Sequence, residues 1–196
     1  MIIGIPKELD KNETRTAINP GTIKSYTKFG FSVIVESGAG TFSHISDDIL
    51  KESGAEIMTN ATEIYQKSDI ILKVNPPTFE EIDIIKEGSL LVSFIQTTKE
   101  KEVVRKLQSK KINAISMHLI PRTTLAQKMD ALSSQSNIAG YKAVLMAACH
   151  IEKYMPLLMT AAGTIPPAKV VVLGAGVAGL QAIATAKRLG AQVEAS

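Results

Sequence analysis

The 196-residue sequence has one cysteine and no tryptophan, and only 5% of its residues are aromatic. A single cysteine excludes an internal disulfide framework and is typical of a reducing compartment. This residue, Cys149, lies in the apolar run VLMAACHI, so we expect a small buried side chain rather than a catalytic thiol. The scarcity of aromatic rings disfavours a surface on which single-stranded nucleic acid stacks.

Long uncharged apolar runs are also absent. The most hydrophobic window, residues 143–163, is interrupted by His150, Glu152 and Lys153. Because a membrane span needs about 20 nearly uncharged residues, none is predicted. The N-terminus has no basic start followed by a long apolar run, so we expect no secretion signal.

Strong net charge and metal-ligand spacing are missing as well. The formal net charge of +3 is too small to indicate a nucleic-acid partner. The one dense basic run, residues 99–111, alternates in sign and predicts the solvated face of a helix. His44, His118 and His150 show no ligand spacing with other histidines, cysteines or carboxylates, so no metal site is predicted.

Apolar runs alternate with amphipathic stretches over the first 120 residues. The predicted strands are 1–5, 31–37, 69–75, 90–96 and 113–120, and the predicted helices are 20–30, 47–54, 79–88 and 99–111. Such alternation predicts an α/β fold with a parallel sheet, and the continuous apolar runs predict burial of both sheet faces. We therefore expect an N-terminal α/β domain over residues 1–135, Rossmann- or flavodoxin-like.

The segment 136–163 is predicted to be an interdomain helix and linker. Residues 136–155 are apolar nearly all round, which is typical of a helix buried between two domains. Ser133 or Ser134 is expected to cap its start, and Pro156 to kink or end it.

A glycine-rich turn follows the apolar strand 170–173. Gly174, Gly176 and Gly179 form a GxGxxG pattern that opens a helix to residue 189, with a second strand from about residue 192. In this context the pattern predicts dinucleotide binding: Gly174 allows the tight turn, Gly176 admits the pyrophosphate, and Gly179 lets helix pack on strand. The helix N-terminus, including Val177 and Ala178, offers free N–H groups to the phosphates. A glycine-rich turn that serves only packing is the alternative.

Residues 164–196 are therefore expected to be the first βαβ part of a Rossmann NAD-binding domain. The acidic residue that selects NAD over NADP is due about 20 residues beyond the turn, where the sequence stops. One βαβ unit does not cover both faces of its own strands. We expect a longer polypeptide or a partner that completes this domain.

The stretch 122–144 combines many polar side chains with no histidine or cysteine. It resembles the NAD(H)-binding alpha subunit of the proton-translocating nicotinamide nucleotide transhydrogenases. Three further stretches share this resemblance: residues 174–191, 4–20 (GIPKE…ETRTAINP) and 73–77 (KVNPP). The N-terminal motifs are similar also to the related alanine dehydrogenases.

The resemblance implies direct hydride transfer between NAD(H) and NADP(H), coupled to proton translocation across a membrane. Such a transfer needs ring placement and no general acid or base. The matching positions that orient the nicotinamide, and so form the catalytic set, are Arg122, Gln127, Asp130 and Ser133. Further contacts with the nucleotide are implied for Thr123, Thr124, Lys128 and Met129.

Several side-chain roles in this stretch stay open. Gln127 is expected to hydrogen-bond the carboxamide or the nearby ribose, and Asp130 to form a charge-assisted pair with Arg122. Residues 135–137 either extend the site or satisfy the helix start. A polar approach to a helix, with Ser133 as cap and Asp130 as a solvated charge, is the alternative.

The resemblance also implies partners. NADP(H) would bind to a partner component, a membrane-spanning component would carry the protons, and two copies of the chain would pair as a homodimer. The chain would then be cytoplasmic and peripherally associated with the inner membrane, with its NAD site in the cleft between its domains.

Two other functions remain open. In an alanine-dehydrogenase-like enzyme a histidine is needed for proton transfer, and its position here is Gln96. Arg15 and Lys73 match the positions that hold the keto acid's carboxylate, but structural ion pairs are an equal explanation. The second alternative is a truncated nucleotide-binding module without turnover.

Overall fold

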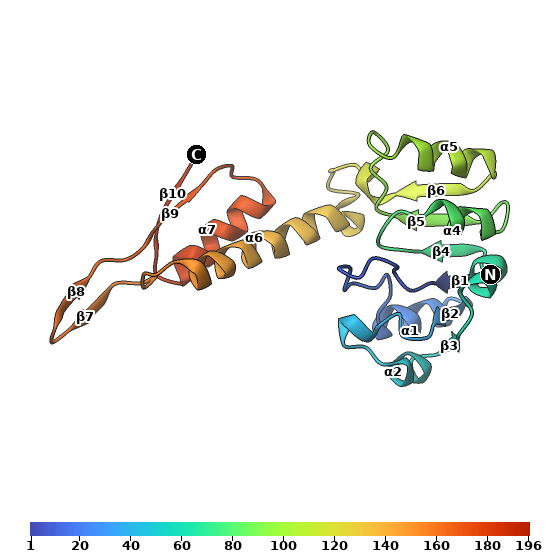
Figure 1. Cartoon of the computed structure of the whole chain (residues 1–196), viewed down its shortest axis with the longest axis horizontal. Helices are drawn as coiled ribbons and strands as arrows, with labels where there is room; N and C mark the ends of the chain where they lie inside the picture. Colours follow the sequence, from blue (N-terminus) through green and yellow to red (C-terminus); the bar gives the residue numbers. More distant parts are fainter. The chain divides into compact units, whose positions relative to one another are not determined.

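A computed structural model describes all 196 residues, and they divide into two compact units, residues 1–120 and 121–196 (Figure 1). The sequence pattern predicts a boundary at residue 135. In the structure the polar stretch that begins at Arg122 belongs to the second unit, together with the helix that follows it.

The first unit is built on one six-stranded parallel sheet in the order β3-β2-β1-β4-β5-β6. The strands are β1 (Ile2–Ile5), β2 (Ser32–Glu36), β3 (Ala55–Met58), β4 (Ile70–Leu72), β5 (Leu90–Ser93) and β6 (Asn113–Ser116). The connecting helices are α1 (Pro20–Lys28), α2 (Asp47–Glu52), α3 (Ala61–Lys67), α4 (Phe79–Ile84) and α5 (Lys101–Ser109), with short 3₁₀ turns η1 (Thr41–Ser43) and η2 (Met117–Leu119). This strand order is the doubly wound Rossmann order, so the predicted fold class is confirmed.

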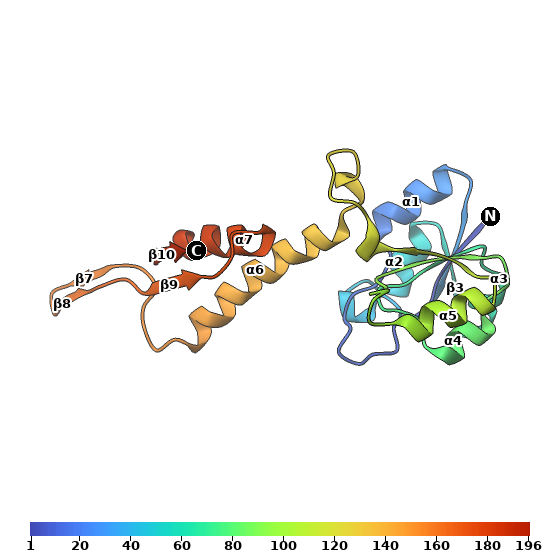
Figure 2. The ribbon, with the colours of Figure 1, turned by 90° about the horizontal axis from the view of Figure 1, so that it is seen from above.

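The sheet separates two hydrophobic cores, as a sheet buried on both faces requires. Ile3 and Ile5 pack with Ile23 of α1 and Leu50 of α2 on one face. On the other face the core comes from α3, α4, α5 and the strands beneath them, and it includes Tyr65, Ile71, Ile82, Leu91 and Leu107. Figure 2 shows α1 and α2 on one side of the sheet and α4 and α5 on the other.

Helix α1 forms where the sequence predicts it. Asn19 is the N-cap, and its side chain and that of Thr22 form a reciprocal capping box ahead of Pro20. The helix ends before Gly30, whose φ of +85° suits glycine and few other residues.

Several predictions for the first unit need correction. The strands expected over residues 69–75 and 90–96 end at Leu72 and Ser93, and the helix expected over residues 79–88 ends at Ile84. The strand expected over residues 113–120 ends at Ser116, and its last residues form η2, where the Ser116 hydroxyl accepts the His118 N–H at 3.1 Å. The sequence pattern also predicts no element at β3 or α3. β3 is an edge strand in which Glu56 is exposed, so it lacks the continuous apolar run that marks β1, β2, β4 and β5.

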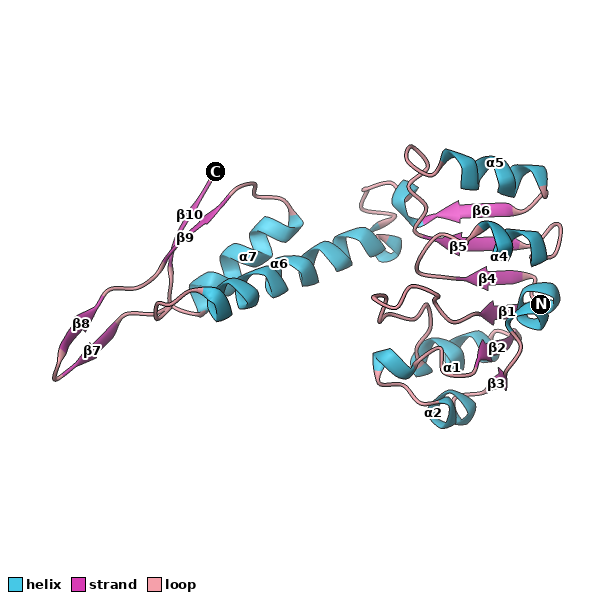
Figure 3. Ribbon diagram, in the orientation of Figure 1, coloured by secondary structure: helices cyan, strands magenta, loops and turns pink.

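The second unit holds the predicted βαβ element and a long helix. The parallel strands β9 (Lys169–Val172) and β10 (Gln192–Ala195) flank α7 (Val177–Arg188), which confirms the βαβ prediction (Figure 3). Helix α6 (Ala131–His150) packs against α7, around a small core of Val144, Met155, Ala168 and Ala186. A short 3₁₀ turn, η3 (Gln127–Met129), precedes α6, and an antiparallel hairpin, β7 (Leu158–Thr160) and β8 (Gly163–Ile165), follows it.

Helix α6 differs from its prediction at both ends. It begins at residue 131 because Asp130, rather than Ser133 or Ser134, is the N-cap. It ends at His150, six residues before Pro156, which was expected to kink or end it. The hairpin that follows was not predicted.

The expected burial of α6 is also wrong. Only Gly140 and Val144 are buried in it, whereas the Ile138 side chain is 58% exposed and Cys149 is exposed as well. The apolar pattern is present, but α7 covers only one stripe of the helix. None of the helices combines the length and the hydropathy that a membrane-spanning helix needs.

Candidate nucleotide site

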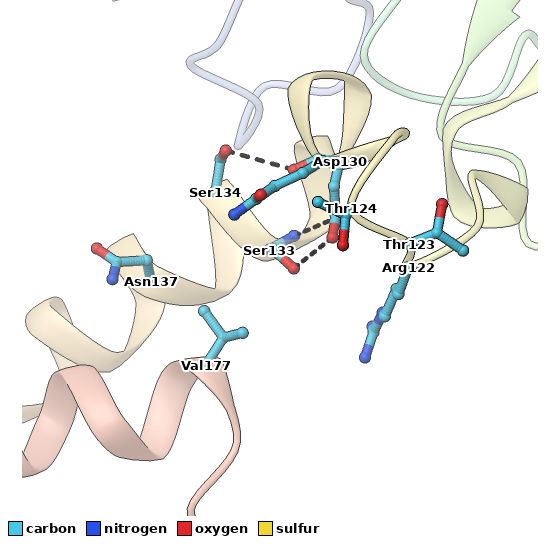
Figure 4. Close-up of a pocket in the computed structure, with 9 residues that line it drawn as sticks. Arg122, Thr123, Thr124, Asp130, Ser133, Ser134, Asn137 and Val177 are labelled. Atoms are coloured by element: carbon cyan, nitrogen blue, oxygen red, sulfur yellow. Dashed lines mark hydrogen bonds between the residues drawn. The ribbon is translucent and has the colours of Figure 1, made fainter.

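A polar cavity of about 870 Å³ lies in the second unit, at the start of α6 (Figure 4). Most of its lining comes from residues 122–133, which we call the ring loop. The lining residues are Arg122, Thr123, Thr124, Gln127, Asp130, Ser133, Ser134, Asn137 and Val177. Most of these side chains bear a hydrogen-bonding group.

A second cavity, of about 310 Å³, lies over residues 174–179, which we call the phosphate turn. Its lining residues are Arg122, Ser133, Ser136, Leu173, Gly174, Gly176, Val177, Ala178 and Gly179. Arg122, Ser133 and Val177 line both cavities, so the two spaces adjoin. The structure thus brings the predicted ring loop and the predicted phosphate turn to one place.

Asp130 shapes the end of the ring loop. Its Oδ1 accepts the backbone N–H of Ser133 at 2.9 Å, and its Oδ2 accepts the Ser133 hydroxyl at 2.6 Å. These hydrogen bonds stabilise the charged form, so the pKa of Asp130 lies below its ordinary value. The carboxylate is therefore an anchored anion at the N-terminus of α6, where the helix dipole also favours negative charge.

The expected ion pair between Asp130 and Arg122 is not formed. Ser133 engages both Asp130 oxygens, and the Arg122 side chain extends away from Asp130 in Figure 4. The positive charge of Arg122 still lowers the pKa of Asp130, less than the Ser133 hydrogen bonds do. Arg122 is exposed and lies beside both cavities, so its guanidinium is available to a bound anion or amide.

Ala126 is the one buried apolar residue of the ring loop. It leads directly into η3, which carries Gln127 at the cavity. Lys128 and Met129 share this turn, but neither lines either cavity. The 3₁₀ geometry thus separates Gln127 from its two neighbours.

Three glycines of the phosphate turn have three different environments. Gly174 has a φ of +98°, a conformation that L side chains rarely adopt. A Cβ on Gly179 would lie 1.8 Å from the carbonyl oxygen of Gly174, so packing requires glycine there. Gly176, in contrast, has an extended backbone (φ −75°, ψ −170°) and open space where its Cβ would be. Neither conformation nor packing explains Gly176.

Some lining residues were not predicted as ligands. Ser134 lines the polar cavity although its sequence position predicts only a cap, and Leu173 lines the second cavity as the last residue before the turn. Asn137, for which the sequence allows either a site role or a role at the helix start, lines the polar cavity. It also donates a hydrogen bond to Gln181 at 3.1 Å. Gln181 lies in the middle of α7, where no sequence motif points to it.

The first unit holds a buried charged cluster at the ends of β1 and β4. Lys73 is 2% exposed in its side chain, and its Nζ lies 2.7 Å from Glu81 Oε1 and 3.6 Å from Glu8 Oε2. Tyr65 donates a hydrogen bond to the same Glu81 oxygen. Burial raises the pKa of Glu8 above its ordinary value, against the lowering effect of the Lys73 charge. Burial likewise raises the pKa of Tyr65.

Both positions that match a keto-acid site form ion pairs within the chain. Lys73 pairs as above, and Arg15 pairs with Glu13 at 2.6 Å. Gln96 lies with its Nε2 3.3 Å from His118 Nε2, and the His118 ring packs edge-on against Phe94. No group of three or more histidine, cysteine, aspartate or glutamate side chains is arranged to hold a metal ion.

The comparisons with known proteins show the family of this chain. A family model described as "Alanine dehydrogenase/PNT, N-terminal domain" matches residues 4–139, and its C-terminal counterpart matches residues 143–196. The NAD(P) transhydrogenase subunit alpha of Haemophilus influenzae is 52% identical over 195 residues, covering 100% of this chain and 38% of that protein. A polypeptide of the NAD(P) transhydrogenase subunit alpha of Rhodospirillum rubrum is 48% identical over 201 residues, covering 100% of this chain and 52% of that protein.

A solved structure extends the likeness to three dimensions. The crystal structure of transhydrogenase from Sinorhizobium meliloti matches with a TM-score of 0.95 at 43% identity, covering 100% of this chain and 58% of that one. The chain spans about half or less of the length of the curated relatives cited above. The resemblance expected from the sequence is confirmed, and the chain belongs to the alanine dehydrogenase/PNT family.

Proposed function

We propose that this chain is the NAD(H)-binding part of a proton-translocating transhydrogenase. The polar cavity would take the nicotinamide end of the dinucleotide, and the phosphate turn would take its pyrophosphate. The adjoining cavities support this assignment because a dinucleotide needs one continuous site with two chemically different ends.

Gly176 is the observation that carries the proposal. A turn that served only packing would explain Gly174 by its positive φ and Gly179 by its close contact, but it would not need glycine at residue 176. Open space at this position is what a phosphate group requires if it is to approach the backbone N–H groups at the start of α7. Gly176 is also the N-cap of α7 and offers no side-chain acceptor to those N–H groups.

The side chains of the ring loop suit placement rather than proton transfer. Bound NAD(H) supplies the hydride at its nicotinamide ring, and the chain's own residues hold that ring. Gln127 presents an amide that matches the donor and acceptor of a carboxamide. Asp130 is held as an anion by Ser133, so it is an acceptor and not a proton donor near neutral pH. Arg122 supplies a donor between the two cavities.

The partners follow from the same proposal. A second component would bind NADP(H) and receive or supply the hydride, and a membrane-spanning component would carry protons. The chain would then lie at the cytoplasmic face of the inner membrane, held there by these components. The relatives from Haemophilus influenzae and Rhodospirillum rubrum are named as alpha subunits, which is consistent with a multi-component enzyme.

We also propose that two copies of the chain pair through the second unit. Large apolar side chains are exposed on α6, just before the hairpin and on the hairpin itself, including Tyr141, Met146, Leu157 and Met159, the last of which is 72% exposed. Apolar patches of this kind commonly mark a protein interface.

The test uses the polypeptide that carries this chain, assembled with its NADP(H)-binding component. We expect NADH to bind by calorimetry and hydride to pass from NADH to an NADP⁺ analogue. Pyruvate with ammonia should not oxidise NADH, because Lys73 and Arg15 are already paired and Gln96 is not a proton donor. Amino-acid oxidation without transhydrogenation would contradict the proposal and favour the dehydrogenase alternative.

A further inference from the structure

Helices α6 and α7 lie side by side in both views of the ribbon (Figures 1 and 2). Gly140 of α6 faces the backbone of Ala178 in the first turn of α7. A Cβ built on Gly140 would lie 2.1 Å from the carbonyl oxygen of Ala178 and 3.0 Å from its Cα. Both of these are backbone atoms, which do not rotate out of the way. Gly140 therefore lets the backbone of α6 rest directly on the first turn of α7.

A polar contact one turn away supports this crossing. Asn137, three residues before Gly140, donates its amide N–H to Gln181 Oε1 at 3.1 Å, and Gln181 is three residues after Ala178. Gln181 in turn donates to the Thr185 hydroxyl at 3.2 Å, and Thr185 is buried. Residues three apart share one helix face, so the two contacts lie on the same stripe of each helix. Together they set both the distance and the rotation between the helices.

Each helix carries one half of the candidate site at its N-terminus. The ring loop ends at Asp130, the N-cap of α6, and the phosphate turn ends at Gly176, the N-cap of α7. Ala178 lies within the lining of the second cavity and Asn137 within that of the first. The helix crossing is thus the rigid connection between the two halves.

We propose that Gly140 is a positioning residue, and that the Asn137–Gln181 hydrogen bond assists it. They set the spacing between the ring loop and the phosphate turn, and so the place of the nicotinamide relative to the anchored pyrophosphate. This inference rests on the proposed function, because it concerns the same dinucleotide. It assigns a role in hydride transfer to residues that need not touch the ring.

The size of the effect follows from the contact. Ordinary Cβ contacts begin at 3.4 Å, so a methyl group on Gly140 must move the Ala178 carbonyl by more than 1 Å. A misplacement of about 1 Å costs on the order of 100-fold in the rate of a reaction that depends on alignment. Because Ala178 belongs to the phosphate turn, we expect this turn to move as a unit with α7. Ligands that occupy only the phosphate turn should therefore lose little affinity.

The test compares Gly140→Ala with Ala139→Ser in the assembled enzyme. Ala139 is exposed and adjacent on the same helix, so its variant controls for a small added group. For Gly140→Ala we expect hydride transfer to fall about 100-fold, NADH affinity to fall by less than tenfold, and ADP affinity to stay within twofold of the wild type. Ala139→Ser should match the wild type in all three.

A second variant covers the possibility that Gly140→Ala does not fold. Gln181→Ala removes the acceptor for Asn137 without any steric clash, and Gln181 lines neither cavity. We expect it to lower the hydride-transfer rate several-fold at unchanged ADP affinity. Gln181→Glu keeps the acceptor for Asn137 but loses the donor to Thr185, so it should restore part of the rate. Unchanged rates in folded Gly140→Ala, or equal losses of rate, NADH affinity and ADP affinity, would overturn the inference. A wild-type enzyme that fails to bind NADH would instead overturn the proposed function.

Discussion

The three glycines of the phosphate turn allow the proposed pyrophosphate site to be separated from simple loss of folding. Gly176→Ala adds one methyl group at a residue with φ −75° and ψ −170°, a conformation open to any L residue. No atom other than those of residues 175–177 lies within 4 Å of the added Cβ. The protein itself should therefore accept the change with a melting temperature within about 2 °C of the wild type, since surface substitutions of this kind usually stay within about ±0.5 kcal/mol.

Nucleotide binding should respond very differently. The methyl group would extend into the 310 Å³ cavity, in front of the N–H groups at the start of α7. A pyrophosphate displaced from these donors loses charge-assisted hydrogen bonds worth roughly 1.5–3 kcal/mol each. Loss of one such bond corresponds to a Kd for NADH that is about 10- to 100-fold higher. Gly176→Val, with its larger side chain, should abolish binding.

The matched control is Gly179→Ala, which adds the same group three residues later. Here the Cβ would lie 1.8 Å from the Gly174 carbonyl oxygen, so the turn itself must distort. We expect a clear fall in melting temperature, because overpacking of this kind typically costs about 1–3 kcal/mol. Calorimetric titration with NADH and thermal unfolding of each variant measure both effects. A folded Gly176→Ala that binds NADH as tightly as the wild type would refute the reasoning.

Three further predictions concern side chains described above. Gln127→Asn should lower the rate of hydride transfer far more than NADH affinity, because the shorter amide still binds but shifts the ring; equal losses in both, measured by stopped-flow and calorimetry, would contradict this. Asp130 has a lowered pKa, so its contribution to stability is present above the unfolded value of about 3.9 and is lost as the pH falls through the folded pKa. The transfer rate should accordingly show no titration of Asp130 between about pH 5 and 8, and an apparent pKa in that range that disappears in Asp130→Asn would argue against an anchored anion. Lys73→Met should destabilise the protein by about 3–5 kcal/mol in chemical denaturation, because Glu81 and Glu8 would remain buried without their cation; a loss under about 1 kcal/mol would show that the cluster is not a structural pair.

The central strands and the phosphate turn were predictable because one physical requirement dominates each of them. A strand covered by helices on both faces must be apolar at every position, so β1, β2, β4 and β5 appear as continuous runs. The phosphate turn combines a tight bend with a close helix packing, and both requirements select glycine. The start of α1 was equally predictable, since proline is favourable at the first helical position (N1) and at few other positions of a helix.

Edges and helix ends were harder to predict because several residues satisfy them equally well. β3 forms one edge of the sheet and carries Glu56 on its exposed side, so its pattern looks like a loop. At α6, Asp130, Ser133 and Ser134 are all good N-caps, and only the bond geometry shows that Asp130 caps and Ser133 donates. That geometry also explains why Arg122 does not pair with Asp130, which the sequence pattern favoured.

Gly140 shows most clearly what a single sequence does not contain. In an apolar helix a lone glycine lowers helix propensity by about 1 kcal/mol and indicates nothing more specific. The need for glycine comes from the Ala178 carbonyl, which is distant in sequence. Its oxygen lies so near Gly140 that a Cβ there would clash with it. Gly176 has the opposite environment, with open space in place of a neighbour. The close backbone contact explains the glycine at residue 140, whereas at residue 176 the proposed function supplies the reason, a phosphate group in the open space.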